Sequence, residues 1–292
     1  MTLKTESVRG GAPVTQVTGA PPRNARKKRR RGPHRWVMWQ RIVLSAGGVI
    51  ALGLFFEVAT RYWIDNPRYL PPFIDILGRF FQFFAEPVFY AQVWATISGF
   101  LIGLAIASVL GIGLGILFGL WEVSYRSSRT VIELLRPIPP VALIPVFILL
   151  FKTGPVMKTI IVLYACVWPI MFNALYGVRN VDPLLKDMAR SFGRSRADVI
   201  RSVVIPAALP MIWTGVRVAS TIALIVVITV ELLIGGSVGV GGIINNARAT
   251  GDDVYARFAA IIVAGLLGLL VNIGLGVVER RFFAWSTTTR EG

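Results

Sequence analysis

Two residue types that often carry chemistry in proteins are nearly missing from this chain of 292 residues. It contains one histidine, His34, and one cysteine, Cys166. A single cysteine excludes an intrachain disulfide, and a single histidine leaves no cluster of metal ligands and no Ser/His/Asp arrangement. The phosphate-binding pattern GxxxxGK[ST] is also absent from the sequence. We therefore expect no catalytic residue, no metal site and no nucleotide chemistry in this chain.

Charged residues are scarce as well. They make up 16% of the chain, against 54% hydrophobic residues, and the mean hydropathy is +0.65. No charge occurs in Pro87–Trp121, Thr159–Val178 or Phe258–Val278. A helix needs ~20 apolar residues to cross the ~30 Å hydrocarbon core of a bilayer, so each stretch is long enough. Three weaker stretches complete a predicted all-α integral membrane protein, with a transmembrane domain over 37–286 and six spans near 42–62, 92–120, 131–151, 159–178, 212–235 and 258–278.

Acidic residues are the rarer kind of charge, 15 against 31 Lys and Arg, and the basic residues are unevenly placed. With six spans, the N-terminal tail, the 122–136 loop, the 179–210 loop and the C-terminus share one side of the membrane. That side carries 23 of the basic residues, and the loops opposite carry 7. Lys and Arg concentrate in cytoplasmic loops, so both termini are predicted to be cytoplasmic.

The first 36 residues form a basic tail that includes the run RKKRRR at 26–31. The tail is rich in Gly, Pro, Thr and Arg, and we expect it to be disordered. Attraction to anionic lipids accounts for its charge. Binding to nucleic acid is the alternative, and it is disfavoured because the basic residues of the whole chain follow the membrane topology.

Small residues recur at every fourth position of the second predicted span. They are Gly99, Gly103, Ala107, Gly111, Gly115 and Gly119. This spacing puts all six on one stripe of a helix. Small side chains let another helix backbone approach closely, which matters in lipid because the hydrophobic drive between helices is small there. We predict a tight helix–helix contact along the stripe, with a partner in this chain or in another subunit.

Four prolines fall within nine residues of the stretch Arg136–Lys158: Pro137, Pro139, Pro140 and Pro145. Proline kinks or breaks a helix, and the freed backbone groups must be satisfied inside protein or in a wet cavity. Two alternatives stay open. Either a broken helix lines a substrate path, with Pro140 and Pro145 as candidates, or a helix begins with prolines in its first turn.

Three charged residues fall within the predicted spans. Glu57 and Arg217 lie close enough to span ends for their side chains to reach the interface. Glu231 lies at the outer end of the fifth span, just before the sequence GGSVGVGG. It is a candidate for shaping a gate or for pairing with a cation.

The loop between the fourth and fifth spans has the punctuation of two short helices. Asp182 followed by Pro183 is an N-cap with proline at the first helical position. Gly193 follows as a C-terminal cap, where a left-handed residue ends a helix cheaply. Ser195 and Asp198 form a capping box that starts a second helix.

This second helix is expected to run to Ile205, with Pro206 and Pro210 marking a break before the fifth span. A capped, basic element over 183–206 is typical of a rigid knob that connects to another protein. A helix lying on the lipid surface would explain the charge and the apolar face, but it would not explain the caps.

The same segment resembles the cytoplasmic EAA loop of bacterial ABC importer permeases. The pattern of that loop is Glu-Ala-Ala, three residues, Gly, nine residues, Ile, any residue, Leu-Pro. In this chain Asp187-Met188-Ala189, Gly193, Val203 and Ile205-Pro206 take those places. The similarity extends from about 70 to 285, and LPPFIDIL at 70–77 and GLLGLLVNIGLGVVERRFFAW at 265–285 resemble the nitrate/sulfonate/taurine group of these permeases.

The resemblance implies a type I ABC importer permease fold in the bacterial inner membrane, with two permease copies, as a homodimer, forming the pathway. Two ATPase subunits that hold ATP and Mg would bind below, and a substrate-binding protein outside, so this chain needs no cofactor. The coupling residues expected in the loop are Asp187, Ala189, Arg190, Gly193, Arg194, Arg196 and Pro206.

The substrate implied by the resemblance is a small organic anion such as a sulfonate or taurine, with nitrate or a vitamin precursor as alternatives. A gradient-driven secondary transporter or channel is the rival function. Such proteins usually keep carboxylates or histidine relays in the membrane, and here only Glu57 and Glu231 are available.

Overall fold

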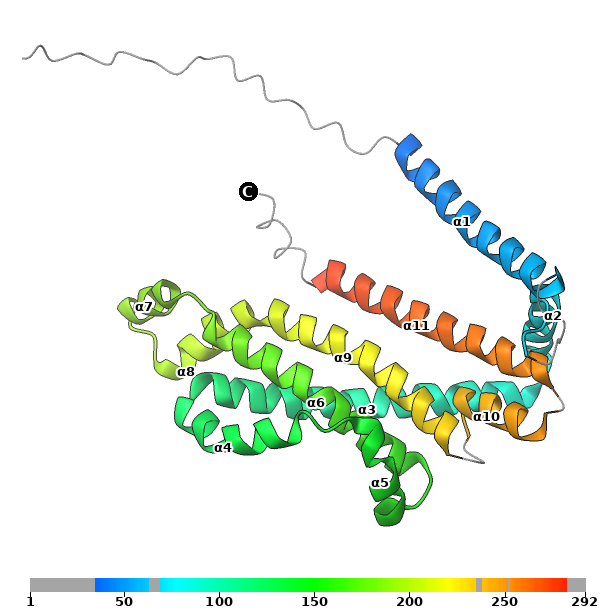
Figure 1. Ribbon diagram of the computed structural model, residues 1–292. Coiled ribbons are helices and arrows are strands. Elements are labelled where there is room, and N and C mark those ends of the chain that lie inside the picture. The colour runs from blue at the N-terminus through cyan, green and yellow to red at the C-terminus, as the bar shows by residue number, and fades with distance from the viewer. Residues whose placement is uncertain (1–34, 63–68, 235–237, 252, 283–292) are drawn as a thin grey trace, which may run out of the picture. The chain divides into compact units, whose positions relative to one another are not determined.

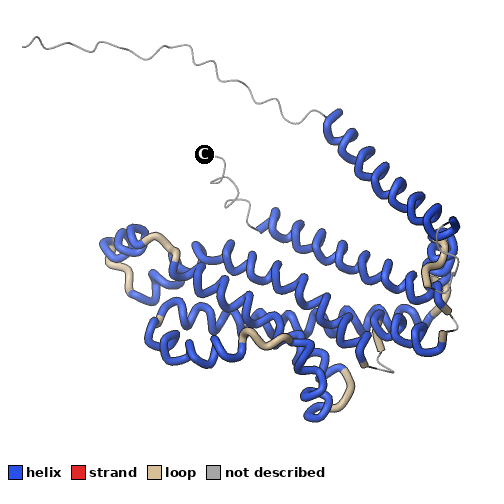
Figure 2. Tube along the Cα trace, viewed as in Figure 1, coloured by secondary structure: helices blue, strands red, loops and turns tan. Residues whose placement is uncertain are grey.

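The computed structural model describes residues 35–62, 69–234, 238–251 and 253–282, and every regular element in these ranges is helical (Figures 1 and 2). The predicted all-α class is confirmed. The basic tail predicted at 1–36 lies outside the described residues except for its last two positions. The helices are α1 Arg35–Tyr62, α2 Phe73–Phe83, α3 Pro87–Leu120, α4 Glu122–Leu135, the 3-10 helix η1 Pro140–Leu143, α5 Ile144–Phe151, α6 Pro155–Arg179, α7 Pro183–Ser191, α8 Arg196–Val199, the π-helical segment η2 Ile200–Val204, α9 Ile205–Leu233, α10 Val240–Thr250 and α11 Val254–Phe282.

The chain divides into two compact units between Leu52 and Gly53, within α1. Residues 35–52 are the described part of the first unit, and they form one helical stretch. The predicted span 42–62 falls on α1. All other helices belong to the second unit.

Four helical stretches of the described chain are long and apolar enough to cross a membrane: α3, α6, Arg196–Leu233 and α11. A fifth results if α4 and α5 are counted as one span bent by 78°. The predicted span 131–151 is therefore not one continuous helix, which agrees with the alternative of a broken helix. The proline-rich connection from Arg136 to Pro140 interrupts it, because proline lacks an N–H and disfavours helical geometry in the residue before it.

Three long helices, α3, α6 and α9, form the centre of the second unit (Figure 1). α3 and α6 run in the same direction, since Gly103 lies against Val162 and Gly119 against Val178. α9 runs the opposite way. The end where α3 and α6 stop and α9 starts carries α7 and α8, and we call it the loop end. The other end, where α3 and α6 start and α9 stops, is the opposite end.

Two helices lie within the segments expected to be plain outer loops, 61–91 and 236–257. α2 and α10 pack against α11 through a cluster that includes Phe80, Val240 and Ala260. Arg79 of α2 fixes this arrangement by ion pairs with Glu86, at 2.5 Å, and with Asp253, at 2.6 Å. The opposite end is thus closed by packed helices.

Candidate functional site

The helix α7 has the caps that the sequence predicts. The Asp182 carboxylate accepts a hydrogen bond from the N–H of Leu184 at 2.8 Å. At the other end Gly193 has φ +76°, and its N–H donates to the carbonyl of Arg190 at 2.8 Å. Glycine adopts this left-handed geometry without the cost that a side chain adds, so α7 ends in a sharp, defined turn.

The capping box of the following helix is also confirmed. The N–H of Asp198 donates to the hydroxyl of Ser195 at 3.2 Å, and that hydroxyl donates to the Asp198 carboxylate at 2.7 Å. The hydrogen bond from the Ser195 side chain holds the pKa of Asp198 below its ordinary value. Because this pKa is lowered, the Asp198 carboxylate is ionised at neutral pH and accepts the bond from the Ser195 hydroxyl.

The break expected at Pro206 and Pro210 is absent. α8 passes through the π-helical segment η2 into α9, so that Arg196–Leu233 is one helical stretch of 38 residues. Pro206 lies in the first turn of α9, and Pro210 is inside it. The π segment just before Pro206 has already displaced the i→i−4 ladder, so the missing N–H of this proline interrupts little.

The loop is exposed on two faces of different character. The apolar side chains of α7 are open to the surroundings; they are Leu184, Leu185, Met188 and Phe192, the last 83% exposed. The expected coupling residues Asp187, Arg190, Gly193, Arg194 and Arg196 are exposed too, and Ala189 is half-buried. Pro206 is exposed at the start of α9.

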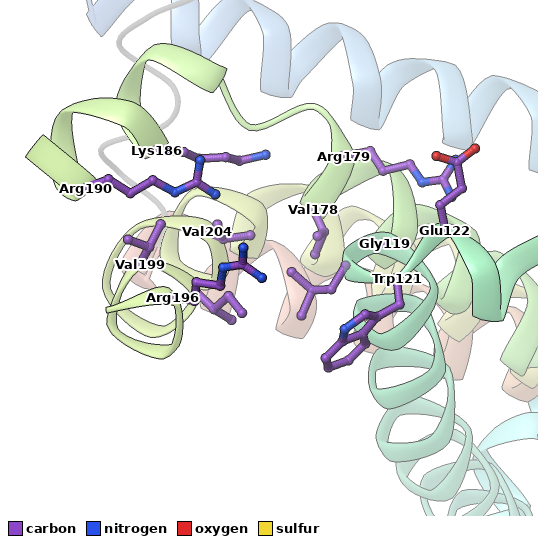
Figure 3. A pocket seen from close by; sticks show the side chains of 12 residues that line it. Gly119, Trp121, Glu122, Val178, Arg179, Lys186, Arg190, Arg196, Val199 and Val204 are labelled. Atoms are coloured by element: carbon purple, nitrogen blue, oxygen red, sulfur yellow. The ribbon is translucent and has the colours of Figure 1, made fainter. Parts of the chain in front are cut away.

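A cavity of about 740 Å³ lies between this loop and the ends of α3 and α6. Its charged lining consists of Arg179, Lys186, Arg190, Arg196 and Glu122. Figure 3 shows Lys186 and Arg190 pointing from α7, and Arg196 from α8, toward the space in front of Gly119 and Val178. Lys186, Arg190 and Arg196 of the loop thus share one concave space.

The glycine stripe of α3 lies against α6 and α9 of the same chain. A Cβ atom on Gly115 would stand 2.5 Å from the carbonyl oxygen of Met171 and from Cβ of Ala174. Cβ atoms on Gly103, Gly111 and Gly119 would also meet α6 at under 3.0 Å, and one on Gly99 would meet Val227 of α9 at 3.3 Å. The alternative of a partner in another subunit is therefore not needed for these five glycines.

At the opposite end, Glu231 is fully buried and forms an ion pair with Lys158, at 2.8 Å. The hydroxyl of Thr96 donates to the second carboxylate oxygen at 2.8 Å, and the N–H of Gly241 donates to it at 3.1 Å. Lys158 also donates to the carbonyl of Val238 at 2.7 Å. One carboxylate therefore connects α3, α6, α9 and the start of α10.

Two further hydrogen bonds hold the same backbone. The N–H of Val240 donates to the hydroxyl of Thr96 at 2.8 Å, and the N–H of Gly239 donates to the side-chain oxygen of Gln92 at 2.5 Å. We call Gln92, Thr96, Lys158, Glu231 and the backbone of 238–241 the outer network. A second cavity, of about 440 Å³, lies beside it and is lined by Lys158, Ser98 and Thr159 among others.

Lys158 is the functional candidate that sequence reasoning missed. It was assigned to a loop outside the membrane, whereas it is a buried residue of α6, which begins at Pro155. The signal was present: a lysine next to an apolar run of 20 residues, and a glutamate at the matching end of another span. Charges at that depth require partners, so the two could have been paired.

Glu57 and Arg217 also have partners. Glu57 accepts from Arg61 at 2.5 Å and from the N–H of Ile74 at 3.1 Å. Arg217 of α9 pairs with Glu279 of α11. Both residues are therefore fixed by neighbours within the second unit.

The two candidate prolines, Pro140 and Pro145, lie in different surroundings. Pro140, at the start of η1, lines a cavity of about 600 Å³ together with Trp168 and Asn173 of α6. Pro145 is exposed in the first turn of α5 and does not line it. Of the two prolines, only Pro140 lines this cavity. Within the described ranges no three His, Cys, Asp or Glu side chains gather as metal ligands.

The chain matches the model of a known protein family. Residues 108–284 match the model of the family described as "Binding-protein-dependent transport system inner membrane component". The matched range begins within α3 and covers α4, η1, α5, the whole of α6, the loop, and α9, α10 and α11.

Individual relatives span nearly the whole chain. The taurine transport system permease protein of Escherichia coli (strain K12) is 30% identical over 269 residues, which is 90% of this chain and 96% of that protein. The bicarbonate transport system permease protein of Synechococcus elongatus is 30% identical over 253 residues, 85% of this chain and 83% of that protein.

A solved structure has the same fold at low sequence identity. It is a bacterial ABC transporter involved in the import of the acidic polysaccharide alginate. It aligns with a TM-score of 0.60 and 14% identity, over 85% of this chain and 96% of that one. The comparison bears on the fold alone.

Proposed function

Because the chain belongs to the family of binding-protein-dependent transport system inner membrane components, and is a permease subunit of an ATP-driven importer, we propose that its loop 183–206 couples a partner ATPase to a pathway for a small anion. The exposed apolar face of α7 is the observation that carries this proposal. Three large apolar side chains on the nine residues of α7, together with Phe192 directly after it and with arginines at the rim, have the composition of a protein interaction site.

The geometry of the loop suits a mechanical connection. Its caps fix the direction of α7, and α8 continues into the 38-residue helical stretch. Of the exposed arginines, Arg194 does not line the cavity and would meet acidic groups of the ATPase, which adds specificity and speed of association more than affinity. Movement of the ATPase would reach the spanning helices through α8.

The outer network is proposed as the extracytoplasmic gate, with Glu231 as its centre. Its hydrogen bonds hold the backbone of 238–241 against α3 and α6. Opening a path at this end requires those bonds to be exchanged for bonds to water or substrate. Pro140, beside its cavity, is proposed to line the inner part of the path.

The proposed substrate is a small anion, with taurine, another sulfonate, nitrate and bicarbonate as the candidates to test. Relatives named for taurine and for bicarbonate support this class. The cavity at the opposite end supports it as well, because Lys158 and the hydroxyl-bearing Ser98 and Thr159 line it. The ligand of the cognate binding protein tests the class directly, and a cationic ligand would refute it.

The complete importer is proposed to contain two copies of this chain, two ATPase subunits that hold ATP and Mg, and one binding protein. We place the loop end and both termini in the cytoplasm of a bacterial cell, on the distribution of Lys and Arg. A cysteine introduced at Arg194 should react with membrane-impermeant reagents only in inverted vesicles, and one at Gly251 only in intact spheroplasts. The reverse pattern would overturn the orientation.

Docking through α7 is tested by Phe192→Asp. The variant should insert into the membrane, lose stoichiometric copurification of the ATPase subunit and lose transport, because a charge replaces the most exposed apolar group of the face. Val123→Asp is the matched control, since Val123 is 77% exposed at the same end and lies outside the loop. A Phe192→Asp complex that keeps its ATPase and transports normally would refute docking by this face.

A further inference from the structure

The cavity at the loop end lies on the side of α7 that faces away from its apolar residues. Lys186 and Arg190 line the cavity, one helical turn apart. Leu185, Met188 and Phe192 project from the other side of the same helix, on the spacing of an amphipathic face, and do not line it. An occupant of the cavity would therefore be enclosed between the loop and the helical bundle, away from the face proposed to dock the ATPase.

The charges of the cavity are not balanced within the described chain. Four cations and a single carboxylate, Glu122, line it, and one of the cations, Arg190, is paired with Asp187 outside the lining at 3.3 Å. The Glu122 carboxylate accepts two hydrogen bonds from Arg126. Lys186 and Arg196 form no ion pair among the described residues. Like charges that share a concave space repel one another, so the space favours an anion with several acceptor oxygens.

The position of the cavity selects the source of that anion. The apolar helix α3 ends at Leu120 and α6 ends at Arg179, and both residues are in the lining. Trp121, beside them, is 54% exposed, and tryptophan is typical of the level of the lipid head groups. Val178 and Val204, both buried, form the apolar floor beneath the charges. An apolar floor, a tryptophan at the level of the head groups and a set of cations thus occur together here, and a site for an anionic phospholipid requires this combination.

We propose that this cavity binds the phosphate head group of an anionic phospholipid. Lys186 and Arg196 hold the phosphate, and the lipid fills the space between the loop and the ends of α3 and α6 (Figure 3). The bound lipid braces α7 against the bundle. Coupling then depends on the lipid composition of the membrane. This inference uses the inner face of α7 and stands whether or not the outer face docks an ATPase.

The test uses the intact complex of permease and ATPase subunits in nanodiscs of phosphatidylcholine with an increasing share of phosphatidylglycerol. Native mass spectrometry counts the phosphatidylglycerol retained per permease copy. Retention should saturate at one molecule per copy. The double variant Lys186→Gln/Arg196→Gln should weaken it about fivefold for each charge removed. The ATPase activity of wild type should rise with the phosphatidylglycerol share, and that of the variant should stay flat.

The matched control is Arg194→Gln/Arg201→Gln, which removes two exposed charges from the same region without touching the cavity lining. It should retain phosphatidylglycerol as wild type does. Equal loss in both double variants would show general surface attraction and overturn the site. Displacement of the lipid by millimolar inorganic phosphate would assign the cavity to a free anion instead.

Two outcomes separate this inference from ATPase docking. If the cavity took acidic side chains of the ATPase, removing the ATPase subunits would raise phosphatidylglycerol retention in wild type, which would refute the lipid site in the complex. If the lipid site is correct and docking by α7 is not, Phe192→Asp keeps its ATPase, and lipid retention still falls in Lys186→Gln/Arg196→Gln. If Lys186→Gln/Arg196→Gln fails to assemble, the wild-type titration decides alone. Phosphatidylglycerol retention that saturates supports the site, and retention that rises without saturating overturns the proposal.

Discussion

The two ends of the helical bundle differ in how far their charged side chains are buried and in whether these side chains are paired. At the opposite end Lys158 and Glu231 are buried, with side chains 8% and 0% exposed, and each has several partners. At the loop end the pair Asp187–Arg190 is exposed, at 68% and 57%, and Lys186 and Arg196 have no carboxylate partner among the described residues. The charged residues of the opposite end find their partners within the chain, whereas Lys186 and Arg196 at the loop end are available to a partner molecule.

The difference has a physical consequence for stability. An exposed ion pair contributes ~1 kcal/mol or less, because water screens it. Breaking a buried pair by removing one partner costs ~3–5 kcal/mol, because the remaining charge stays buried without compensation. Charge substitutions should therefore damage folding at the opposite end, and assembly with other molecules at the loop end.

The largest effect is expected for Lys158→Met, which leaves the Glu231 carboxylate buried without its cation. We expect a loss of ~3–5 kcal/mol in the free energy of unfolding and little folded protein in the membrane. Thermal unfolding of the purified permease, followed by size-exclusion chromatography, measures it. The control is Arg217→Met, whose partner Glu279 is 34% exposed, and which should cost ~1 kcal/mol or less.

A double variant sharpens the first prediction. Lys158→Met/Glu231→Met removes both charges, and a buried pair replaced by apolar groups often loses little stability. Stability should return toward wild type while transport stays impaired, because the gate has lost the groups that exchange bonds. If the double variant transports normally, the outer network is only structural.

The next effect concerns the packing of α3 against α6 between the two ends. Gly115→Leu places a side chain where a Cβ atom alone would stand 2.5 Å from the backbone of α6, so α3 and α6 must separate. We expect a loss of ~1–3 kcal/mol or more, and failure to assemble. Gly113→Leu is the control, since nothing lies within 4 Å of its Cβ position. The yield of assembled complex measures the effect. Equal yields of the two variants would show that the glycine stripe does not hold α3 against α6.

The smallest effect on stability, and the sharpest contrast between the ends, comes from two glycines of similar geometry. Gly193 at the loop end has φ +76°, Gly251 at the opposite end has φ +70°, and neither Cβ position has a neighbour within 4 Å. Replacing either by aspartate should cost ~1 kcal/mol of backbone strain. Gly193→Asp should abolish transport and the response of ATP hydrolysis to the loaded binding protein, since the side chain would meet the partner.

Gly251→Asp should keep both activities. Measured side by side, the two variants separate backbone strain from the effect of position. Stimulated hydrolysis at wild-type level in Gly193→Asp would mean that the turn of the loop meets no partner.

Local rules predicted the local features of the loop end. Asp182, Gly193 and Ser195 act on groups within a few residues, so their roles can be read from neighbouring letters of the sequence. The stripe of α3 was equally visible, because its spacing depends on one helix alone. The helix that packs against this stripe could not be predicted, because any helix with small side chains on one face would fit.

The outer network could not be predicted in the same way. Lys158 and Glu231 are 73 positions apart, and their meeting depends on α6 and α9 running in opposite directions. Pro206 shows the other limit of local reasoning. Two prolines predict a break, yet the π segment before them changes which carbonyls need donors, and only the folded backbone reveals that change.

The helical stretch Arg196–Leu233 joins the two ends without interruption. At ~1.5 Å of rise per residue its 38 residues are about 57 Å long. It carries the capping box at one end and Glu231 two residues from the other. Rotation applied to the first turn of this stretch would pass through the five π-helical residues of η2 and along α9, and it would reach the contact of the Glu231 carboxylate with Lys158.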